Sequence, residues 1–206
     1  MVIVIKAPFA ADGSNNTLYT IGASSNIPSR NARCIFIDTS RTNDGPNTKA
    51  WVACNSYLPT ANGTTTSGML GQGLYSTTKF FRNISEGINI ASGSASVNTV
   101  GGNSSEIWAY APLNNGINQL LSYNAGTNAL IKYYDHNTDA IIPSGFSARA
   151  IYGDAKKRIW IGLANNGLLV FDEHRNWHYV NLPTTIYPAG TQVNFNAITG
   201  DKWGDI

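Results

Sequence analysis

The sequence predicts an all-β fold and, within that class, a four-bladed β-propeller whose blades are four-stranded antiparallel sheets. Two observations predict it. Short runs rich in β-branched and aromatic residues are separated by Asn, Gly, Asp and Pro along the chain, as in antiparallel hairpins. A unit of about 50 residues with four such runs is repeated, and propeller blades repeat at about this period. The 206 residues contain no evident linker, so we expect one domain over 1–206.

The clearest unit begins at Ala148. Its later part reads "RIWIGLANNGLLVFDEHRNWHYVN", in which Asn-Asn-Gly and the polar segment after Phe-Asp supply turn residues between apolar runs. The strands predicted for this unit are Ala148–Tyr152, Arg158–Leu163, Leu168–Phe171 and Trp177–Val180.

Two further copies precede this unit. "EIWAYAPLNNGINQLLSYNAGTNALIKYYD" aligns with it in order, so that Trp108 falls on Trp160 and the two Asn-Asn-Gly turns coincide. A weaker copy is formed by "KAWVACNSYL", which supplies Trp51, and by "GLYSTTKFFRNI", which supplies a second pair of strands. Three complete units would leave a propeller open, because about four blades is the observed minimum.

The two ends of the chain together supply the strands of a fourth blade. "FNAITGDKWGDI" at the C-terminus resembles "ARAIYGDAKKRIWIG" at the start of the clearest unit. Pairing the terminal segments would remove exposed sheet edges and close the ring. An open all-β sandwich with a similar number of strands is the alternative. The strands expected in the shared blade are Phe195–Thr199, Lys202–Ile206, Val2–Lys6 and Thr17–Gly22.

"RIWIGLANNGLLVFD" and "LLSYNAGTNALIKYYD" resemble the propeller repeat of bacterial two-component-regulator sensor proteins, with Asn124 in place of the usual Asp. The resemblance covers Val97–Leu182 well and the rest of the chain less closely. It implies a propeller scaffold and names no catalytic residue. The long multi-blade arrays of that family are absent here, so the resemblance does not imply a sensor role.

Tryptophans recur at one position of the repeat. Trp51, Trp108, Trp160 and Trp203 each occupy the second strand of a unit, so we expect them to be buried between neighbouring blades. Trp177 lies outside this series, at the start of an outer strand. We therefore expect it to be less packed, and it is a candidate binding residue.

The two cysteines, Cys34 and Cys54, lie in the first predicted hairpin, whose turn centres near Asp44-Gly45. This placement would let them face each other across the strands. Reduced, buried thiols are favoured, because free Cys packs as a small apolar residue and a disulfide directly across a ladder is strained.

Residue patterns for catalysis or metal binding are missing, so we expect no catalytic residue, metal or cofactor and no enzymatic activity. His174 and His178 are four residues apart in "HRNWH". On a strand this spacing separates them by roughly 13 Å, too far for shared metal ligation. Only 13% of the residues are charged, and the Lys and Arg residues are scattered, which argues against a nucleic-acid partner. Since no apolar run reaches the roughly 18 residues of a span, no membrane partner is expected.

Gly, Asn, Ser and Thr supply the polarity that charged residues supply in most proteins, which is similar to the composition of extracellular or phage virion proteins. "MVIVIKAPFAADG" lacks the features of a secretion signal. The leading hypothesis is therefore a non-enzymatic structural module of a phage virion, such as a tail-fibre, adaptor or decoration component in an oligomeric assembly. The alternative is a secreted or periplasmic carbohydrate-binding propeller. The expected partners are other virion proteins or a glycan receptor.

Unequal loops predict the binding face. In a propeller, the connections between second and third strands and those between blades gather on one face. Pro59–Leu70 and Pro183–Gln192 are longer than packed blades require, and loops on a rigid scaffold carry function. Tyr187, an aromatic residue beside a proline, is the predicted anchor for the partner.

Overall fold

The computed structural model describes three consecutive antiparallel sheets and one hairpin. The residues described are 3–5, 18–20, 32–38, 49–54, 69–74, 81–83, 97–112, 118–127, 129–165, 167–180, 182–188, 191–201 and 205–206. Within them all regular structure is β-strand, and none forms a helix with the length and hydropathy needed to cross a membrane.

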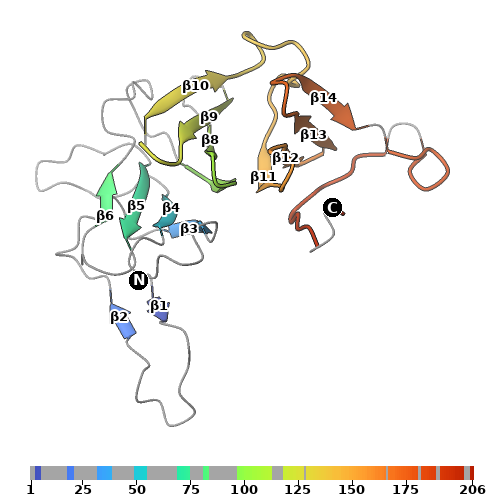
Figure 1. The fold of residues 1–206 in the computed structure, drawn as a ribbon. Coiled ribbons are helices and arrows are strands. Elements are labelled where there is room, and N and C mark those ends of the chain that lie inside the picture. Colours follow the sequence, from blue (N-terminus) through green and yellow to red (C-terminus); the bar gives the residue numbers. More distant parts are fainter. Residues whose placement is uncertain are drawn as a thin grey trace, which may run out of the picture.

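Each sheet is a four-stranded meander in which every strand pairs with its neighbour in sequence. Figure 1 shows the three sheets side by side in chain order. The first sheet contains β3 (Ala32–Asp38), β4 (Lys49–Cys54), β5 (Met69–Leu74) and β6 (Phe81–Asn83). The second contains β7 (Thr99–Gly102), β8 (Glu106–Pro112), β9 (Asn118–Asn124) and β10 (Leu130–Tyr134). The third contains β11 (Ala148–Gly153), β12 (Ile159–Leu163), β13 (Leu168–Phe171) and β14 (Trp177–Val180).

The predicted strands of the third sheet are confirmed to within one residue at each end, and the second sheet has the same order of four strands, as the alignment of the two units predicts. The first sheet differs from the prediction at β5. This strand begins at Met69 because Met69 and Leu70 pair with Cys54 and Ala53 of β4. Both residues therefore belong to a strand, although the sequence placed them in the loop Pro59–Leu70. Residues 59–68 lie outside the described part.

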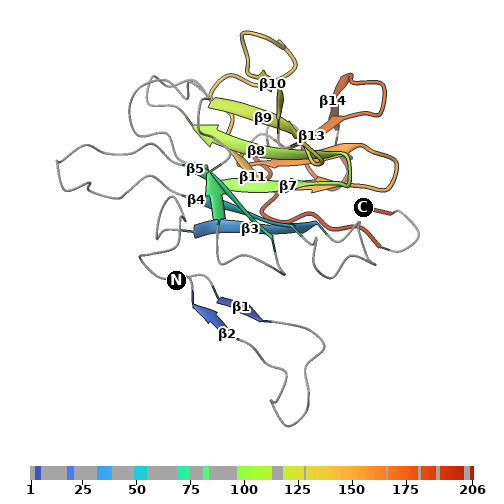
Figure 2. The ribbon, with the colours of Figure 1, turned by 60° about the vertical axis from the view of Figure 1, so that its left-hand side comes forward.

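The sheets meet through their first strands. β7 lies against both β3 and β11, and Figure 2 shows the three strands running side by side. A methyl group added to Gly101 would lie only 2.0 Å from the carbonyl oxygen of Ile151, and one added to Gly153 would lie 2.4 Å from Gly102. Backbone therefore meets backbone where side chains would hold the strands apart. We call β3, β7 and β11 the inner strands.

Alternation along β8 produces two cores. Ile107, Ala109 and Ala111 are buried in a cluster with Trp51 of the first sheet. Trp108, on the opposite face of the strand, belongs to a cluster with residues of the third sheet. A strand covered on both faces needs a near-continuous apolar sequence, which explains the composition of β8.

The predicted tryptophan series is only partly realised. Trp51 and Trp108 are fully buried, as expected, whereas Trp160 is half-buried. Trp203 lies outside the described residues. The expectation that Trp177 is loosely packed is wrong: its side chain is 6% exposed, within an aromatic cluster that includes Trp108 and Phe171. Although β14 is an outer strand, this ring points into the interface between the second and third sheets.

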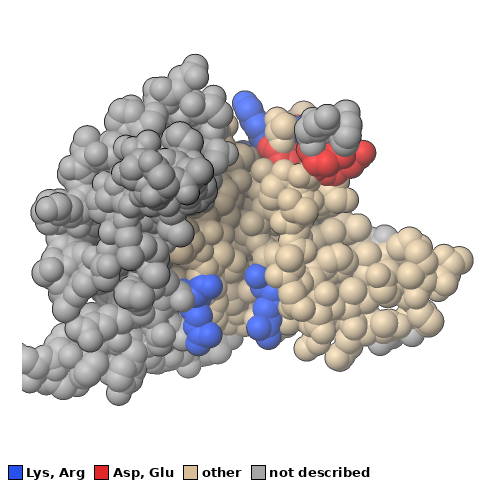
Figure 3. All heavy atoms as spheres, turned by 90° about the horizontal axis from the view of Figure 1, so that it is seen from below, with Lys and Arg blue, Asp and Glu red and all other residues tan. Residues whose placement is uncertain are grey.

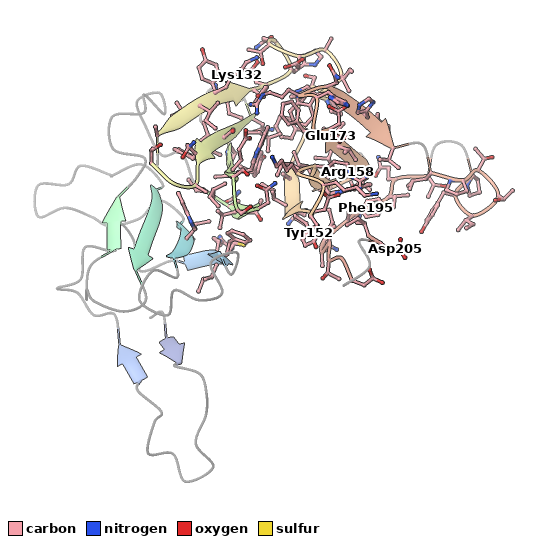
Figure 4. All side chains as sticks on the ribbon, viewed as in Figure 1. Lys132, Tyr152, Arg158, Glu173, Phe195 and Asp205 are labelled. Atoms are coloured by element: carbon pink, nitrogen blue, oxygen red, sulfur yellow. The ribbon has the colours of Figure 1, made fainter. Side chains whose placement is uncertain are left out.

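Among the described residues, the two chain ends do not pair in one sheet, so the predicted closure of the ring is not confirmed. β1 (Ile3–Ile5) and β2 (Leu18–Thr20) pair as the predicted hairpin, but they form a separate two-stranded sheet. The segment Phe195–Thr199 contains no strand, which corrects the prediction for it. It nevertheless lies against the third sheet, where Figure 4 labels Phe195.

Hydrogen bonds explain how this C-terminal segment is held. The N–H of Phe195 donates to the Leu163 carbonyl at 3.1 Å, and the N–H of Gly167 donates to the Val193 carbonyl at 3.2 Å. These hydrogen bonds to the end of β12 and to the turn that follows it hold the segment in place without strand pairing.

Candidate binding site

Two inner strands carry an arginine at a β-bulge. In β11, Ala148 pairs with Leu163 and Ala150 pairs with Gly162, so Arg149 has no residue opposite it. In β3, Ala32 pairs with Cys54 and Cys34 pairs with Ala53, so Arg33 occupies the equivalent position. The bulge also offsets the two cysteines, which are not directly opposite each other. A bulge re-aims the side chain of its extra residue.

Asn98 occupies the equivalent position before the inner strand of the second sheet. Thr99 pairs with Tyr110, and the N–H of Asn98 donates to the carbonyl of the same Tyr110 at 3.0 Å. Two successive residues thus oppose one, as in the other two inner strands. The three sheets therefore share a bulge at the start of the inner strand as well as the same order of strands.

The three bulges lie at the same level of neighbouring strands. Gly101 approaches Ile151 and Gly102 approaches Gly153, so β7 and β11 run in the same direction. On the other side of β7, the thiol of Cys34 donates to the Val100 carbonyl at 3.4 Å. Cys34 is a free thiol. Since it follows Arg33 directly, these contacts bring Arg33, Asn98 and Arg149 to one end of the three strands.

A fourth position follows from the C-terminal segment. The N–H of Asp201 donates to the Asp205 carbonyl at 3.0 Å, as that of Asp154 donates to the Arg158 carbonyl. Asn196 precedes Asp201 by five residues, as Arg149 precedes Asp154, so Asn196 occupies the position equivalent to Arg149. We call Arg33, Asn98, Arg149 and Asn196 the bulge cluster. Arg33, Arg149 and Asn196 are exposed, and Asn98 is half-buried.

Tyr110 lies beneath this cluster. Its hydroxyl donates to the Phe146 carbonyl at 3.2 Å, and the Asn118 amide donates to the same oxygen at 2.5 Å. Burial raises the pKa of Tyr110, against the smaller lowering effects of Ser147 and Arg149. The phenol is therefore neutral near pH 7 and anchors the connection that leads into β11.

The other end of the inner strands carries charged groups of both signs, among them Asp154, Arg158 and the exposed Lys156. Asp154 follows β11 and accepts hydrogen bonds from the indole of Trp160 at 3.0 Å and from Nε of Arg158 at 2.6 Å. Burial opposes ionisation of Asp154, but hydrogen bonds from Trp160 and Arg158 outweigh it and lower its pKa. Figure 3 shows two basic side chains apart from each other, and a further basic side chain beside the acidic ones towards the opposite end.

Tyr187, the predicted anchor, is 37% exposed in the connection that follows β14. Its N–H donates to the Pro183 carbonyl at 2.9 Å, which fixes a turn. The N–H of Asn165 donates to the side chain of Asn194 at 2.7 Å. This bond ties the turn after β12 to the C-terminal segment, as expected if these two connections share one face. Trp177, the other predicted binding residue, is enclosed in the core.

The histidine pair lies in a hairpin away from the bulge cluster. His178 Nε2 is 2.6 Å from Asp172 Oδ2, across the turn between β13 and β14. Among the described residues, no group of three or more His, Cys, Asp or Glu side chains is placed to hold a metal ion.

The sequence contained a signal for the bulge cluster that the repeat comparison did not use. Ala32-Arg33-Cys34 and Ala148-Arg149-Ala150 share an Ala-Arg pair at the start of the first strand of two units. Aligning these strands by their tripeptides would have paired the two arginines. That they occupy bulges depends on cross-strand register and could not be read from either segment alone.

No protein-family model matches the chain, and no curated protein matches it either. Among solved structures, it is similar to the extracellular domain of a one-component system from B. thetaiotaomicron, with 13% identity and a TM-score of 0.57 over 91% of this chain and 21% of that one. It is also similar to PorZ, a bacterial surface component of the type-IX secretion system of P. gingivalis, with 16% identity and a TM-score of 0.51 over 82% of this chain and 22% of that one.

The chain thus spans about a fifth of the length of the two solved chains it resembles. At these identities the likeness shows a shared β-rich fold alone. Both similar proteins are extracellular or surface components, and neither supports the predicted phage origin.

Proposed function

We propose that the chain is a non-enzymatic binding module of an extracellular or cell-surface protein, with its sheets arranged as blades of a β-propeller. The packing of β3, β7 and β11 side by side, with the outer strands diverging, supports this arrangement. The C-terminal segment supports a further blade, because it lies against the third sheet and repeats the turn that follows β11. The two extracellular or surface neighbours support the location.

The observation that carries the proposal is the bulge cluster. Two guanidinium groups and two amides come from the same position of successive units, at one end of the inner strands. Such groups bind ligands through fixed hydrogen-bond donors. Arginine stays protonated at all physiological pH values, so this set cannot supply the general base that most hydrolytic reactions need. Binding is therefore favoured over catalysis.

The structural neighbours favour an extracellular or surface module over the virion component that was the leading hypothesis from the sequence. An oligomeric assembly remains a prediction of the sequence. We also propose Tyr187, whose aromatic side chain is exposed, as a binding residue on the same face.

A panel of immobilised glycans and peptides tests this function. We expect at least one ligand to bind the wild-type chain and to be lost with Arg33→Gln or Arg149→Gln. Lys156→Gln is the matched control, because Lys156 is an exposed cation in the turn after β11, at the other end of the inner strands. If binding survives both arginine changes but is lost with Lys156→Gln, the ligand binds at the opposite end of the inner strands and the proposed site is wrong.

A further inference from the structure

Charged and neutral side chains alternate in the bulge cluster from one unit to the next. Its members follow the order of the units: Arg33 on the first sheet, Asn98 on the second, Arg149 on the third and Asn196 on the C-terminal segment. A cation therefore comes before each neutral amide. A linear ligand lying across the ends of these strands would meet an anion-binding group at every second step.

The spacing of the strands suits one extended ligand. Packed sheets lie about 10 Å apart, and the inner strands are closer than this because their backbones touch at Gly101 and Gly153. β7 stands between the two arginine-bearing strands. This arrangement favours two separate anion contacts over one shared contact.

The two kinds of side chain in the cluster determine which chemical group of the ligand binds at each position. A guanidinium offers paired N–H donors that match both oxygens of a carboxylate. An Asn side chain both donates and accepts hydrogen bonds, as hydroxyl and acetamido groups require. We infer that the bulge cluster binds an oligosaccharide in which acidic and neutral sugars alternate. This inference rests on the proposed binding function at the same residues.

An acidic peptide fits the cluster less well. Extended peptides commonly bind by adding a strand to an exposed sheet edge, where main-chain hydrogen bonds supply affinity. β3, β7 and β11 are edge strands of their sheets, but β7 has β3 on one side and β11 on the other, with Gly101 against the Ile151 carbonyl. A peptide strand has no room to pair with β7 between these neighbours, so recognition across the cluster has to use side chains.

Four oligomeric probes separate the possibilities in a calorimetric titration. Hyaluronan oligosaccharides alternate a uronate with an N-acetylhexosamine, oligogalacturonates are acidic at every sugar, chitooligosaccharides are neutral, and oligoglutamate is an acidic peptide. We expect hyaluronan to bind at least about tenfold more tightly than the other three, a difference of about 1.4 kcal/mol.

Variants test the residues. Arg33→Gln and Arg149→Gln should each weaken hyaluronan binding about tenfold or more, since each removes a charge-assisted contact. Arg33→Lys, which keeps the charge but not the paired donors, should lose part of the affinity. Lys156→Gln should bind like the wild-type chain. Unchanged melting temperatures show that the variants fold.

The outcomes distinguish the inference from the function it rests on. Tighter binding of oligoglutamate, oligogalacturonate or chitooligosaccharide, or no binding of hyaluronan, overturns the alternating sugar. If the probe that then binds most tightly is weakened by Arg33→Gln and Arg149→Gln, the proposed binding site is retained. If hyaluronan binds equally well to the wild-type chain and to both arginine variants, the inference is overturned. If every ligand of the wider panel also binds both variants as well as the wild type, the proposed binding site is overturned too.

Discussion

Replacing Trp177 with Ala should destabilise the protein more than replacing Trp160, the reverse of the order that the repeat pattern predicts. The Trp177 ring is 6% exposed, and its centroid lies 4.8 Å from that of Phe171, 5.4 Å from that of Tyr134 and 5.8 Å from that of Trp108. Truncating a buried Trp to Ala typically costs about 3–5 kcal/mol.

One feature places Trp177 at the lower end of that range. Its indole N–H is buried without a hydrogen-bond partner, and an unpaired buried donor costs about 1–3 kcal/mol in the folded state. Removing the indole relieves that cost, so we expect a net loss of about 3 kcal/mol for Trp177→Ala. Trp177→Phe, which keeps a ring and removes the N–H, should lose about 1 kcal/mol or less.

Trp160 is half-buried and donates its indole N–H to Asp154 at 3.0 Å, with the Arg158 guanidinium 5.0 Å from the ring centre. Losing the hydrogen bond and the cation–π contact should cost about 1–2 kcal/mol. Urea titration measures both losses. At about 2–4 °C per kcal/mol for a chain of this size, Trp177→Ala should lower the melting temperature by about 6–12 °C. An equal or larger loss for Trp160→Ala would refute the assignment of Trp177 to the core.

Three further predictions concern the sheets and their turns. Gly101→Ala should cost about 3 kcal/mol or more, since the added methyl would meet the Ile151 carbonyl at 2.0 Å; urea titration checks it, with the exposed Gly126→Ala as control. Glu106→Gln should cost about 1 kcal/mol in the same assay, less at high salt, because the carboxylate accepts from Arg175 across two sheets; a salt-independent loss would contradict the ion pair. The N–H groups of Asn176 and then His178 hold the pKa of Asp172 at about 2, below its unfolded value of about 4. Its contribution to stability should therefore be complete above pH 4 and lost as the pH falls towards 2, a slope that Asp172→Asn should flatten.

Strand positions could be predicted where apolar runs and turn residues coincide. "LLVF" and "WHYV", bounded by Gly167 and by the Asp172 turn, became β13 and β14 at the predicted residues. β5 was harder, because the Thr- and Gly-rich segment before it carries no apolar period, and its pairing with β4 determines where it begins.

Features that depend on contacts between sheets could not be predicted from single units. The burial of Trp177 follows from the position of the second sheet, which the pattern along β14 does not contain. The bulges at Arg33 and Arg149 follow from pairing register, since a bulge shifts the partner of every residue beyond it. Tyr187 is exposed, and its role in binding stays a prediction, whereas the cluster at the ends of the inner strands was not predicted from the sequence.

The glycine contacts between inner strands have a consequence for how such arrays change in number. Gly101, Gly102 and Gly153 let the second and third units meet through main-chain atoms, whereas the first unit, which has Ile37 at the position of Gly153, contacts the second through the Cys34 side chain. Repeat proteins in which each unit contacts only its neighbours are stabilised additively. A duplicated unit that keeps these glycines would present the same main-chain surface to its neighbour. Gene duplication can therefore lengthen the array without a new interface where the inner strands keep glycine at this position.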